Sequence, residues 1–389
     1  MIEGVLGLLA VAIWAYLLTA RGGFWRADQT DAAGVPEPAA WPGVVAVVPA
    51  RDEADVIARS VGSLLAQDYP GAFKVVLVDD DSSDGTAEAA RAAARALGAA
   101  DRLEVLSGAP LPAGWTGKLW AMSQGVARAS ELAPRYLLLT DADIAHDADN
   151  LRRLVARAER GAFTLTSLMA ELHCATFAEK LLIPAFVLFF QMVYPFRQVN
   201  DPRRKLAGAA GGCMLADREA LARAGGVAAI RAAVIDDCAM GAIMKAQGPI
   251  WLGLTHRARS IRPYPDVGAI GRMISRSAFA QLNYSALTLA GTLVGLVLTY
   301  LVPPALAVFG SGPARWAGVV AWLGMAVCFQ PMLRFYRRSP LWGLALPAIG
   351  TLYALFTLQS AIQVWRGEGG MWKGRAQAPT SRSRGARTA

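Results

Sequence analysis

The stretch that decides the fold is Val44-Val45-Ala46-Val47-Val48-Pro49-Ala50-Arg51-Asp52-Glu53, a β-branched run that ends in charged residues. A second run, Val75–Val78, leads in the same way into Asp79-Asp80-Asp81-Ser82-Ser83-Asp84-Gly85-Thr86. A weaker run, Tyr136–Leu139, leads into Thr140-Asp141-Ala142-Asp143. Helical patterns alternate with these runs over 54–66, 87–97 and 119–129. This alternation predicts an α/β, Rossmann-like domain with a mostly parallel sheet between helices.

The acidic residues all follow strands, and ligands of such sheets bind beyond the carboxyl ends of the strands. Singly, each acid has a structural explanation, because Asp84, Ser83 or Asp147 can cap the next helix. Together, their charges would repel one another unless a cation neutralised them. Asp141 and Asp143 point to the same side of an extended chain, as Mg²⁺ or Mn²⁺ ligands that share substrate phosphates would. We therefore predict a divalent metal at Asp143 and Asp141 and a diphosphate-bearing donor.

Glycine-rich phosphate loops are missing from the sequence. No GxGxxG follows a strand, and Gly117-Lys118-Leu119 lacks the upstream glycine and the hydroxyl residue of a Walker A loop. Lys118 does lie where a loop opens a helix, and helix-terminal amides together with an ammonium group attract anions. We assign Lys118 to the donor diphosphate, with a solvated surface lysine as the alternative.

The composition argues against a wholly soluble protein. Of 389 residues, 54% are hydrophobic and 18% are charged, and the mean hydropathy is +0.33. We predict an uncleaved N-terminal transmembrane anchor over 1–22, a linker over 23–43, the catalytic domain over 44–285 and transmembrane helices over 286–365. The last region contains three apolar stretches, 286–309, 314–333 and 341–365. A shorter one, 181–196, predicts an interfacial or re-entrant segment over about 176–197, with a buried domain helix as the alternative.

The net charge of +9 comes largely from a basic tail, 366–389, and from five arginines between 257 and 276 that precede an apolar run. This placement favours anionic headgroups over nucleic acid as the partner. The basic loop 334–338 predicts a cytoplasmic face for itself and for the catalytic domain. Three crossings would then place the basic tail outside the cytoplasm, against the positive-inside trend. Either one segment is re-entrant, with the chain breaking at Pro303-Pro304, or the tail is an exception to that trend.

Four motifs carry a resemblance to a known family: Pro49–Glu53, Val78–Thr86, Asp141–Asp143 and Asp236-Asp237. In this order they resemble the signature of family 2 glycosyltransferases with the GT-A fold, over roughly residues 44–290. The membrane layout and the Gly117-Lys118 loop are similar to the bacterial hopanoid-associated (hopene-associated) branch, and more distantly to ceramide glucosyltransferases. The resemblance implies a multi-pass enzyme of the bacterial inner membrane, with a cytoplasmic catalytic domain, that uses a nucleotide sugar, expected to be a UDP-sugar, and a lipid acceptor.

The resemblance also implies roles for individual residues. Asp80 holds the nucleotide base, Pro49, Arg51, Glu53 and Asp79 complete the donor pocket, and Asp141 and Asp143 serve the metal and the diphosphate. Asp237 is the general base. Asp236, at a position where glutamate is commoner, and Cys213 lie on the acceptor side. Processive members of the family carry Gln or Arg, then two residues, then Arg-Trp. Here the corresponding run is Gln281-Leu282-Asn283-Tyr284, and the missing Arg-Trp pair argues against processive polymerisation. Gln281 and Tyr284 remain candidates for the acceptor side.

The chemistry of the expected step follows from the acceptor. An alcohol needs a base as it attacks, and an in-line attack inverts the anomeric centre of the sugar. A polyprenyl phosphate acceptor is an alternative, because it is already an anion and needs no strong base. A non-catalytic membrane sensor of nucleotide sugars, or a scaffold, is the alternative from another class; it would not need Asp141, Asp143 and Asp237 together.

Overall fold

The computed structural model describes residues 1–367, 371–372 and 375–376. The strands are β1 (Val44–Ala50), β2 (Phe73–Asp79), β3 (Leu103–Ser107), β4 (Tyr136–Thr140), β5 (Ile144–His146), β6 (Leu165–Glu171), β7 (Cys213–Asp217), β8 (Ile250–Ser260), β9 (Met371–Trp372) and β10 (Arg375–Ala376). The helices are α1 (Ile2–Thr19), α2 (Ile57–Leu65), α3 (Thr86–Ala96), α4 (Gly117–Glu131), α5 (Asn150–Gly161), α6 (Phe177–Val193), α7 (Phe196–Val199), α8 (Arg218–Arg223), α9 (Asp236–Lys245), α10 (Val267–Ser275), α11 (Ala278–Gln281), α12 (Ala286–Leu296), α13 (Val302–Phe309), α14 (Gly312–Phe335) and α15 (Leu346–Trp365).

The main sheet has the order β3-β2-β1-β4-β7-β6-β8-β5. Strands β1 to β4 run parallel where they pair, with Val47 opposite both Val76 and Leu139. Strand β7 is antiparallel to β4 and β6, and β5 is antiparallel to β8. The predicted α/β domain with a mostly parallel sheet is therefore confirmed, and the carboxyl ends of β1, β2 and β4 lie at one edge.

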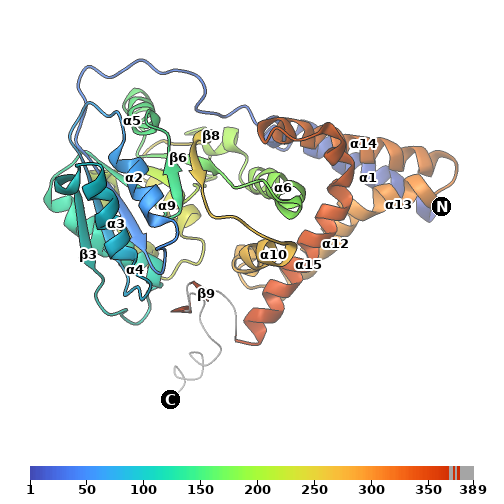
Figure 1. Ribbon diagram of the computed structural model, residues 1–389. Helices are drawn as coiled ribbons and strands as arrows, with labels where there is room; N and C mark the ends of the chain where they lie inside the picture. The colour runs from blue at the N-terminus through green and yellow to red at the C-terminus, as the bar shows by residue number, and fades with distance from the viewer. Residues whose placement is uncertain (368–370, 373–374, 377–389) are drawn as a thin grey trace.

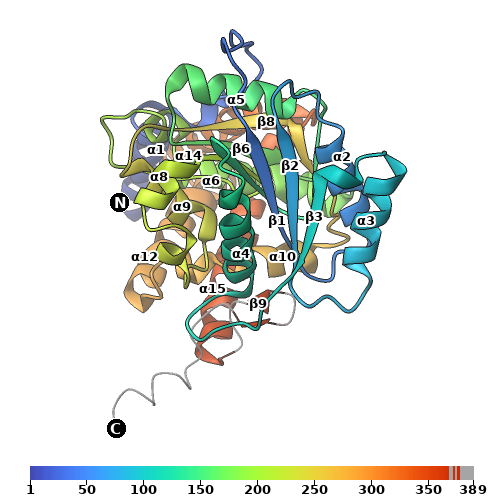
Figure 2. The same cartoon turned by 90° about the vertical axis from the view of Figure 1, so that its left-hand side faces the viewer.

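Both faces of the sheet are covered by helices (Figure 2). Every residue of β1 is buried, as expected for a strand with a continuous apolar run. Val44, Ala46 and Val48 share a core with α2, α3 and α5. Val45 and Val47 share the opposite core with α4, α6 and α9. The loops that precede α2, α3, α4 and α9 lie at the edge of the sheet that carries the acidic residues.

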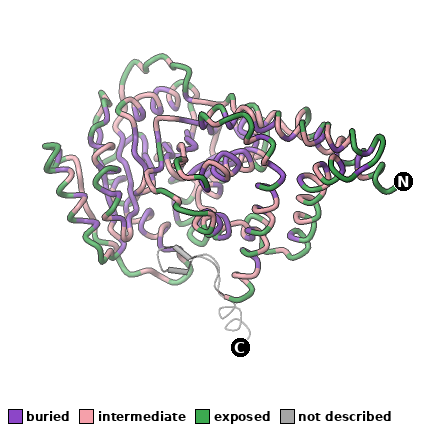
Figure 3. Tube along the Cα trace, turned by 45° about the vertical axis from the view of Figure 1, so that its right-hand side comes forward, coloured by how far each residue is buried: buried purple, intermediate pink, exposed green. Residues whose placement is uncertain are grey.

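Five helices in the described part of the chain are long and apolar enough to cross a membrane: Ile2–Thr19, Phe177–Val199, Ala286–Phe309, Gly312–Phe335 and Pro340–Trp365. Helices α1, α13 and α14 extend away from the sheet, and α6 and α10 lie between (Figure 1). Figure 3 shows burial concentrated in the sheet domain and exposure along the outer helices. Large apolar side chains remain exposed there, including Leu287 at 84% and Phe309 at 83%. Burial in the protein does not account for these surfaces, which suit a hydrocarbon environment.

The chain stays helical through Pro303-Pro304, where one of the two alternatives placed a break. It passes from α12 into α13 through a π-helical turn at Val297–Leu301. Pro303 has no N–H to donate to the carbonyl of Thr299, and the indole N–H of Trp14 on α1 donates to that carbonyl instead, at 2.9 Å. The freed group is thus satisfied by a neighbouring helix.

Helix α6 covers most of the segment predicted as interfacial. It begins with a capping box in which Thr176 accepts from the amide of Glu179, and it continues through Pro184. Leu182, Val187 and other side chains are buried in the core shared with the sheet, and the helix contacts α10, α14 and α15. This packing is what the alternative, a buried helix, requires.

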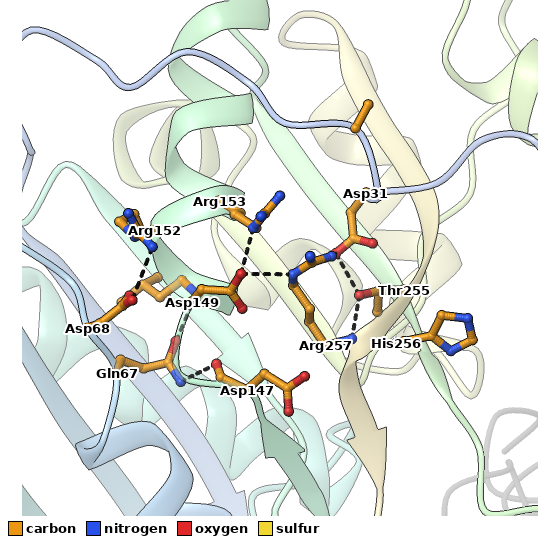
Figure 4. A network of polar contacts seen from close by, with 12 residues as sticks. Asp31, Gln67, Asp68, Asp147, Asp149, Arg152, Arg153, Thr255, His256 and Arg257 are labelled. Atoms are coloured by element: carbon orange, nitrogen blue, oxygen red, sulfur yellow. Dashed lines mark hydrogen bonds and ion pairs between the residues drawn. The ribbon is translucent and has the colours of Figure 1, made fainter.

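The segment predicted as a linker is bound to the sheet domain over part of its length (Figure 4). The carbonyl of Gln29 accepts from the amide of Leu254 at 2.8 Å, next to the bridge between Thr30 and Leu254. Asp31 accepts from the Thr255 hydroxyl at 2.7 Å and pairs with Arg257 at 3.4 Å. Backbone and side-chain bonds together hold this segment along β8.

Most of the five arginines between 257 and 276, which precede the apolar helices, form ion pairs within the domain. Arg257 pairs with Asp31 and Asp149, Arg259 with Asp147, and Arg262 with Glu53 and Asp143. These three arginines are therefore satisfied by the protein's own carboxylates, and only Arg272 and Arg276 of the run are exposed without such an ion pair among the described residues. A role of the run in contacting anionic headgroups or as a positive-inside signal stays a prediction. The predicted basic tail, 366–389, lies almost entirely outside the described residues.

Candidate active site

The loops that follow β1 and β2 are tied to each other. The amide of Asp52 donates to Ser82 Oγ at 2.9 Å, and the amide of Glu53 donates to Thr86 Oγ1 at 2.8 Å. The amide of Ala54 donates to Asp84 Oδ2 at 2.9 Å. Asp84 also accepts from the amide of Thr86, so it organises the loop, as the structural reading allowed. The two acidic motifs thus form one rigid platform.

The predicted donor residues lie on this platform. Asp80 is buried, and Arg51 donates to its backbone carbonyl and lies 3.8 Å from its carboxylate. Asp79 accepts from the amide of Ser82 at 3.2 Å and so bonds within its own loop. Pro49 pairs with Val78 in the sheet, directly before the platform. The structure brings Arg51 and Asp80 together and places Pro49 and Asp79 beside them.

Lys118 connects two acidic motifs that are far apart in the chain. Its ammonium lies 2.7 Å from Asp141 Oδ1 and 2.9 Å from Asp236 Oδ2. Lys118 is the second residue of α4, while Asp236 begins α9. The attraction of Asp141 and Asp236 outweighs the effect of burial and raises the pKa of Lys118 well above its usual range. Lys118 is therefore a permanent cation, 16% exposed and held between two carboxylates, and not the freely solvated lysine of the alternative.

Asp237 lies next to this ion pair. Its Oδ2 accepts from the amide of Gly211 at 3.1 Å, and its Oδ1 accepts from the amide of Cys238 at 2.7 Å. A Cβ added to Gly211 would lie 3.4 Å from Asp237 Cβ and 3.6 Å from Lys118 Nζ. Burial, and then the charge of Asp236, raise the pKa of Asp237 to about 6. Burial acts the same way on Asp236, but Lys118 outweighs it and lowers the pKa of that carboxyl. Two adjacent carboxyl groups thus differ in proton affinity, as a base and a counter-ion should.

Arg262 connects the donor platform to the Asp141-Ala142-Asp143 turn. It pairs with Glu53 and lies 3.2 Å from Asp143 Oδ2. Ala142 is buried in the core, as expected for the residue between two outward acids. Arg262 pairs with Glu53, Asp55 and Asp143, and Lys118 pairs with Asp141 and Asp236. The Asp141-Ala142-Asp143 turn joins the two groups, so that five carboxylates meet two cations, and Asp237 follows Asp236 without an ion pair of its own among the described residues.

The surplus of negative charge fits a divalent cation. Burial, and then the charge of Asp141, raise the pKa of Asp143 despite the opposite effect of Arg262. Asp141 and Asp143 offer the hard oxygen ligands that Mg²⁺ and Mn²⁺ prefer. Among the described residues no three His, Cys, Asp or Glu side chains are grouped as a metal site. The two carboxylates therefore fit an ion that takes its other ligands from phosphates and water.

The acceptor-side predictions are met unevenly by the geometry. Cys213 is buried on the face of the sheet that packs against α2 and α5, where its sulfur lies 3.7 Å from Asn150 Nδ2, so it does not join the group around Asp237. Gln281 accepts a hydrogen bond from the hydroxyl of Tyr194 at 3.0 Å. Tyr284 is partly exposed and packs edge-on against Phe279.

Sequence reasoning missed three contributors to this site. Arg262 was counted with the membrane-flanking charges, since nothing local distinguishes it from Arg259. Gly211 could have been noticed as part of Gly211-Gly212, a pair that lets backbone approach a side chain closely. Tyr194, at the end of α6, has no sequence signal that links it to Asp237.

Comparisons with known proteins concern the domain that carries these residues. Residues 45–225 match the sequence profile of Glycosyl transferase family 2. The mannosyltransferase PcManGT from Pyrobaculum calidifontis, solved with GDP-Man and Mn²⁺, is similar with a TM-score of 0.58 at 19% identity, over 92% of this chain and 99% of that one. This likeness shows a GT-A-like fold.

Two other solved structures are less similar. The glucosyl-3-phosphoglycerate synthase of Mycobacterium tuberculosis, solved with Mg²⁺ and UDP, has a TM-score of 0.41 at 18% identity, over 62% of this chain and 79% of that one. The mannosyl-3-phosphoglycerate synthase of Rubrobacter xylanophilus has a TM-score of 0.38 at 19% identity, over 60% and 70%. No curated protein sequence gives a significant match.

Proposed function

We propose that this chain, a glycosyltransferase with a family 2 domain over residues 45–225, is a membrane-bound enzyme that transfers a sugar from a nucleoside-diphosphate sugar to the hydroxyl of a lipid, with inversion. One observation carries the proposal: Asp237, whose pKa is raised to about 6, lies beside the Lys118 link between Asp141 and Asp236. A carboxylate with this proton affinity can remove a proton from an alcohol near neutral pH.

On the acceptor side, Asp237 takes the proton as the acceptor oxygen forms its bond to the anomeric carbon. The amides of Gly211 and Cys238 fix the direction of the carboxylate, so that it cannot rotate away from the acceptor. Asp236 stays ionised because Lys118 holds it, and its charge keeps the proton affinity of Asp237 high. The base is thereby tuned by its neighbour.

On the donor side, Asp80 and Arg51 bind the nucleoside on the β1 and β2 platform, and Asp141 and Asp143 face the diphosphate. A divalent metal held by Asp143 and Asp141 would offset the charge that develops on the leaving diphosphate. Lys118 and the first amides of α4 add positive potential to the same place. Arg262 neutralises Glu53 and Asp143 and remains within reach of the phosphate oxygens.

The apolar helices support a lipid acceptor. Gln281 and Tyr284 lie a few residues before α12, whose apolar side chains are exposed along its length. An acceptor held in the bilayer could present its hydroxyl at this junction without leaving the membrane. We propose a bacterial inner-membrane location, a cytosolic catalytic domain and a hopanoid-type acceptor, in line with the resemblance of the sequence.

The proposal is tested by incubating membranes that contain the full chain with a panel of radiolabelled UDP- and GDP-sugars, with and without EDTA, followed by lipid extraction and mass analysis. We expect one donor to label a lipid by a glycosidic bond to a hydroxyl, and EDTA to abolish the labelling. Labelling of a polyprenyl phosphate would support the alternative acceptor. Consumption of no donor would refute the enzyme assignment.

A further inference from the structure

Tyr194 ends the apolar helix α6 at the candidate active site. Its hydroxyl donates to Gln281 Oε1 at 3.0 Å, which joins the end of α6 to α11. Gly208, whose backbone lies against the ring of Tyr194, also packs closely against Gly241 of α9. The sulfur of Cys238, the residue that follows Asp237, lies 3.7 Å from the carbonyl oxygen of Ala209, next to Gly208. The end of α6, the backbone at Gly208 and the first turns of α9 are thus packed together close to Asp237.

Packing fixes the ring of Tyr194. Phe190, one helical turn earlier, lies 5.1 Å from it between ring centroids. The backbone of Gly208 also approaches so closely that an added Cβ would lie 3.1 Å from the ring. A side chain held by such packing loses little further entropy when its hydroxyl binds a ligand. The hydroxyl is therefore preorganised for hydrogen bonding beside Asp237.

We infer that Tyr194 is an acceptor-positioning residue, and that its hydroxyl, together with Gln281, orients the alcohol of a lipid acceptor toward Asp237. The inference rests on the proposed function. An alcohol oxygen has one proton and two lone pairs. Its proton goes to Asp237, one lone pair accepts a hydrogen bond from Tyr194 or from the amide nitrogen of Gln281, and the other forms the bond to the anomeric carbon while the bond to the diphosphate breaks.

The position of Tyr194 also indicates the class of acceptor. The residue closes an apolar helix, and the partner segment α11 packs against α15 and is followed by α12. Leu287, on the first turn of α12, is 84% exposed. A long-chain alcohol can lie along such surfaces while its hydroxyl reaches the polar group formed by Tyr194, Gln281 and Asp237. A small polar acceptor would gain nothing from them.

The test uses the purified full-length chain in detergent micelles, with radiolabelled UDP-glucose or GDP-mannose as donor. Dodecanol in the micelles serves as the alcohol acceptor, and water serves as the competing one. Tyr194→Phe removes only the hydroxyl. Tyr16→Phe is the matched control, because Tyr16 is an exposed tyrosine on α1. The readouts are the ratio of dodecyl glycoside to free sugar, the KM for each substrate, the pH profile and the unfolding temperature.

We expect Tyr194→Phe to lower the ratio of dodecyl glycoside to free sugar by about 2- to 10-fold, as for one lost neutral hydrogen bond. The KM for dodecanol should rise, while the donor KM, the pH profile and the values for Tyr16→Phe stay unchanged. Adding Gln281→Met should cost less than the sum of the single effects, because both residues act on one oxygen.

An unchanged ratio, a shift in donor KM alone, or a loss that follows only the unfolding temperature would overturn the inference and leave the proposed function standing. A wild-type chain that releases free sugar but never glycosylates dodecanol would overturn the acceptor class. A wild-type chain that consumes neither these two donors nor any other member of the panel of UDP- and GDP-sugars would overturn the proposed function itself.

Discussion

Replacing Asp237 with asparagine should separate catalysis from stability. Asparagine keeps the size of the side chain but cannot take up the proton, so transfer to an alcohol should fall by about 10²- to 10⁴-fold, the usual contribution of a general base. Donor affinity should change little, since Asp237 bonds to Gly211 and Cys238 and not to the donor platform. In the wild type the rate should rise with pH and level off above about 6, the pKa of Asp237.

The same substitution should stabilise the fold at neutral pH. The pKa of Asp237 lies at about 6 instead of 3.8, so at about 1.4 kcal/mol per unit its buried charge costs about 3 kcal/mol. Asparagine has a single side-chain oxygen, so it can accept only one of the two hydrogen bonds that backbone amides donate to Asp237. The loss of the other hydrogen bond costs about 1 kcal/mol. The folded state binds the proton more tightly than the unfolded state. The carboxylate therefore destabilises the wild type above about pH 6 and ceases to do so as the pH falls below 4.

Thermal and denaturant unfolding of both proteins in detergent, at pH 7.5 and at pH 4, measures the difference. We expect the variant to gain about 2 kcal/mol at pH 7.5 and to lose up to about 1 kcal/mol at pH 4, where the charge cost has largely gone and the lost hydrogen bond remains. Asp147→Asn is the control, because Asp147 is an exposed partner of Arg259. An inactive variant that is destabilised at both values of pH would refute the reasoning, and so would a variant that keeps full transfer to an alcohol.

Two further predictions follow from the ion pairs. Arg262→Gln should lower the unfolding temperature of the metal-free chain and increase the stabilisation by Mn²⁺, because Arg262 and the metal compete for Asp143. The control is Arg259→Gln, since Arg259 pairs with Asp147 instead. An equal Mn²⁺ effect in both variants would contradict the prediction. Asp31→Asn should cost about 1–2 kcal/mol of folding stability, since the substitution removes the negative charge that pairs with Arg257 and leaves only an amide oxygen to accept from Thr255. Glu37→Gln, at an exposed pair, should cost less than about 0.5 kcal/mol, and equal effects would show that the contacts along β8 do not stabilise the fold.

Parts of the site were readable because they depend on short-range order. Asp80, Asp141 and Asp143 follow β-branched or leucine-rich runs, and a buried strand must deliver the residues after it to an edge of the sheet. The bounds of β1, β2 and β4 agree with their predicted runs to within a few residues. Strands β5 to β8 escaped prediction because they are short or mixed in polarity, and the antiparallel position of β7 has no local signal at all.

The alternation of strands and helices, the acidic strand ends and the lengths of the apolar helices could be read from the sequence, since each depends on the period of neighbouring side chains. The partners of the charges could not, because they depend on packing between distant segments. Arg262 meets Asp143 across 119 positions and Glu53 across 209, whereas Arg259, three residues earlier, pairs with Asp147. Lys118 is held between Asp141 and Asp236, and Tyr194 reaches the site from α6. These contacts depend on how the layers pack. Burial removes the water that would otherwise solvate each charge, so each charge must be paired with a group from a distant segment.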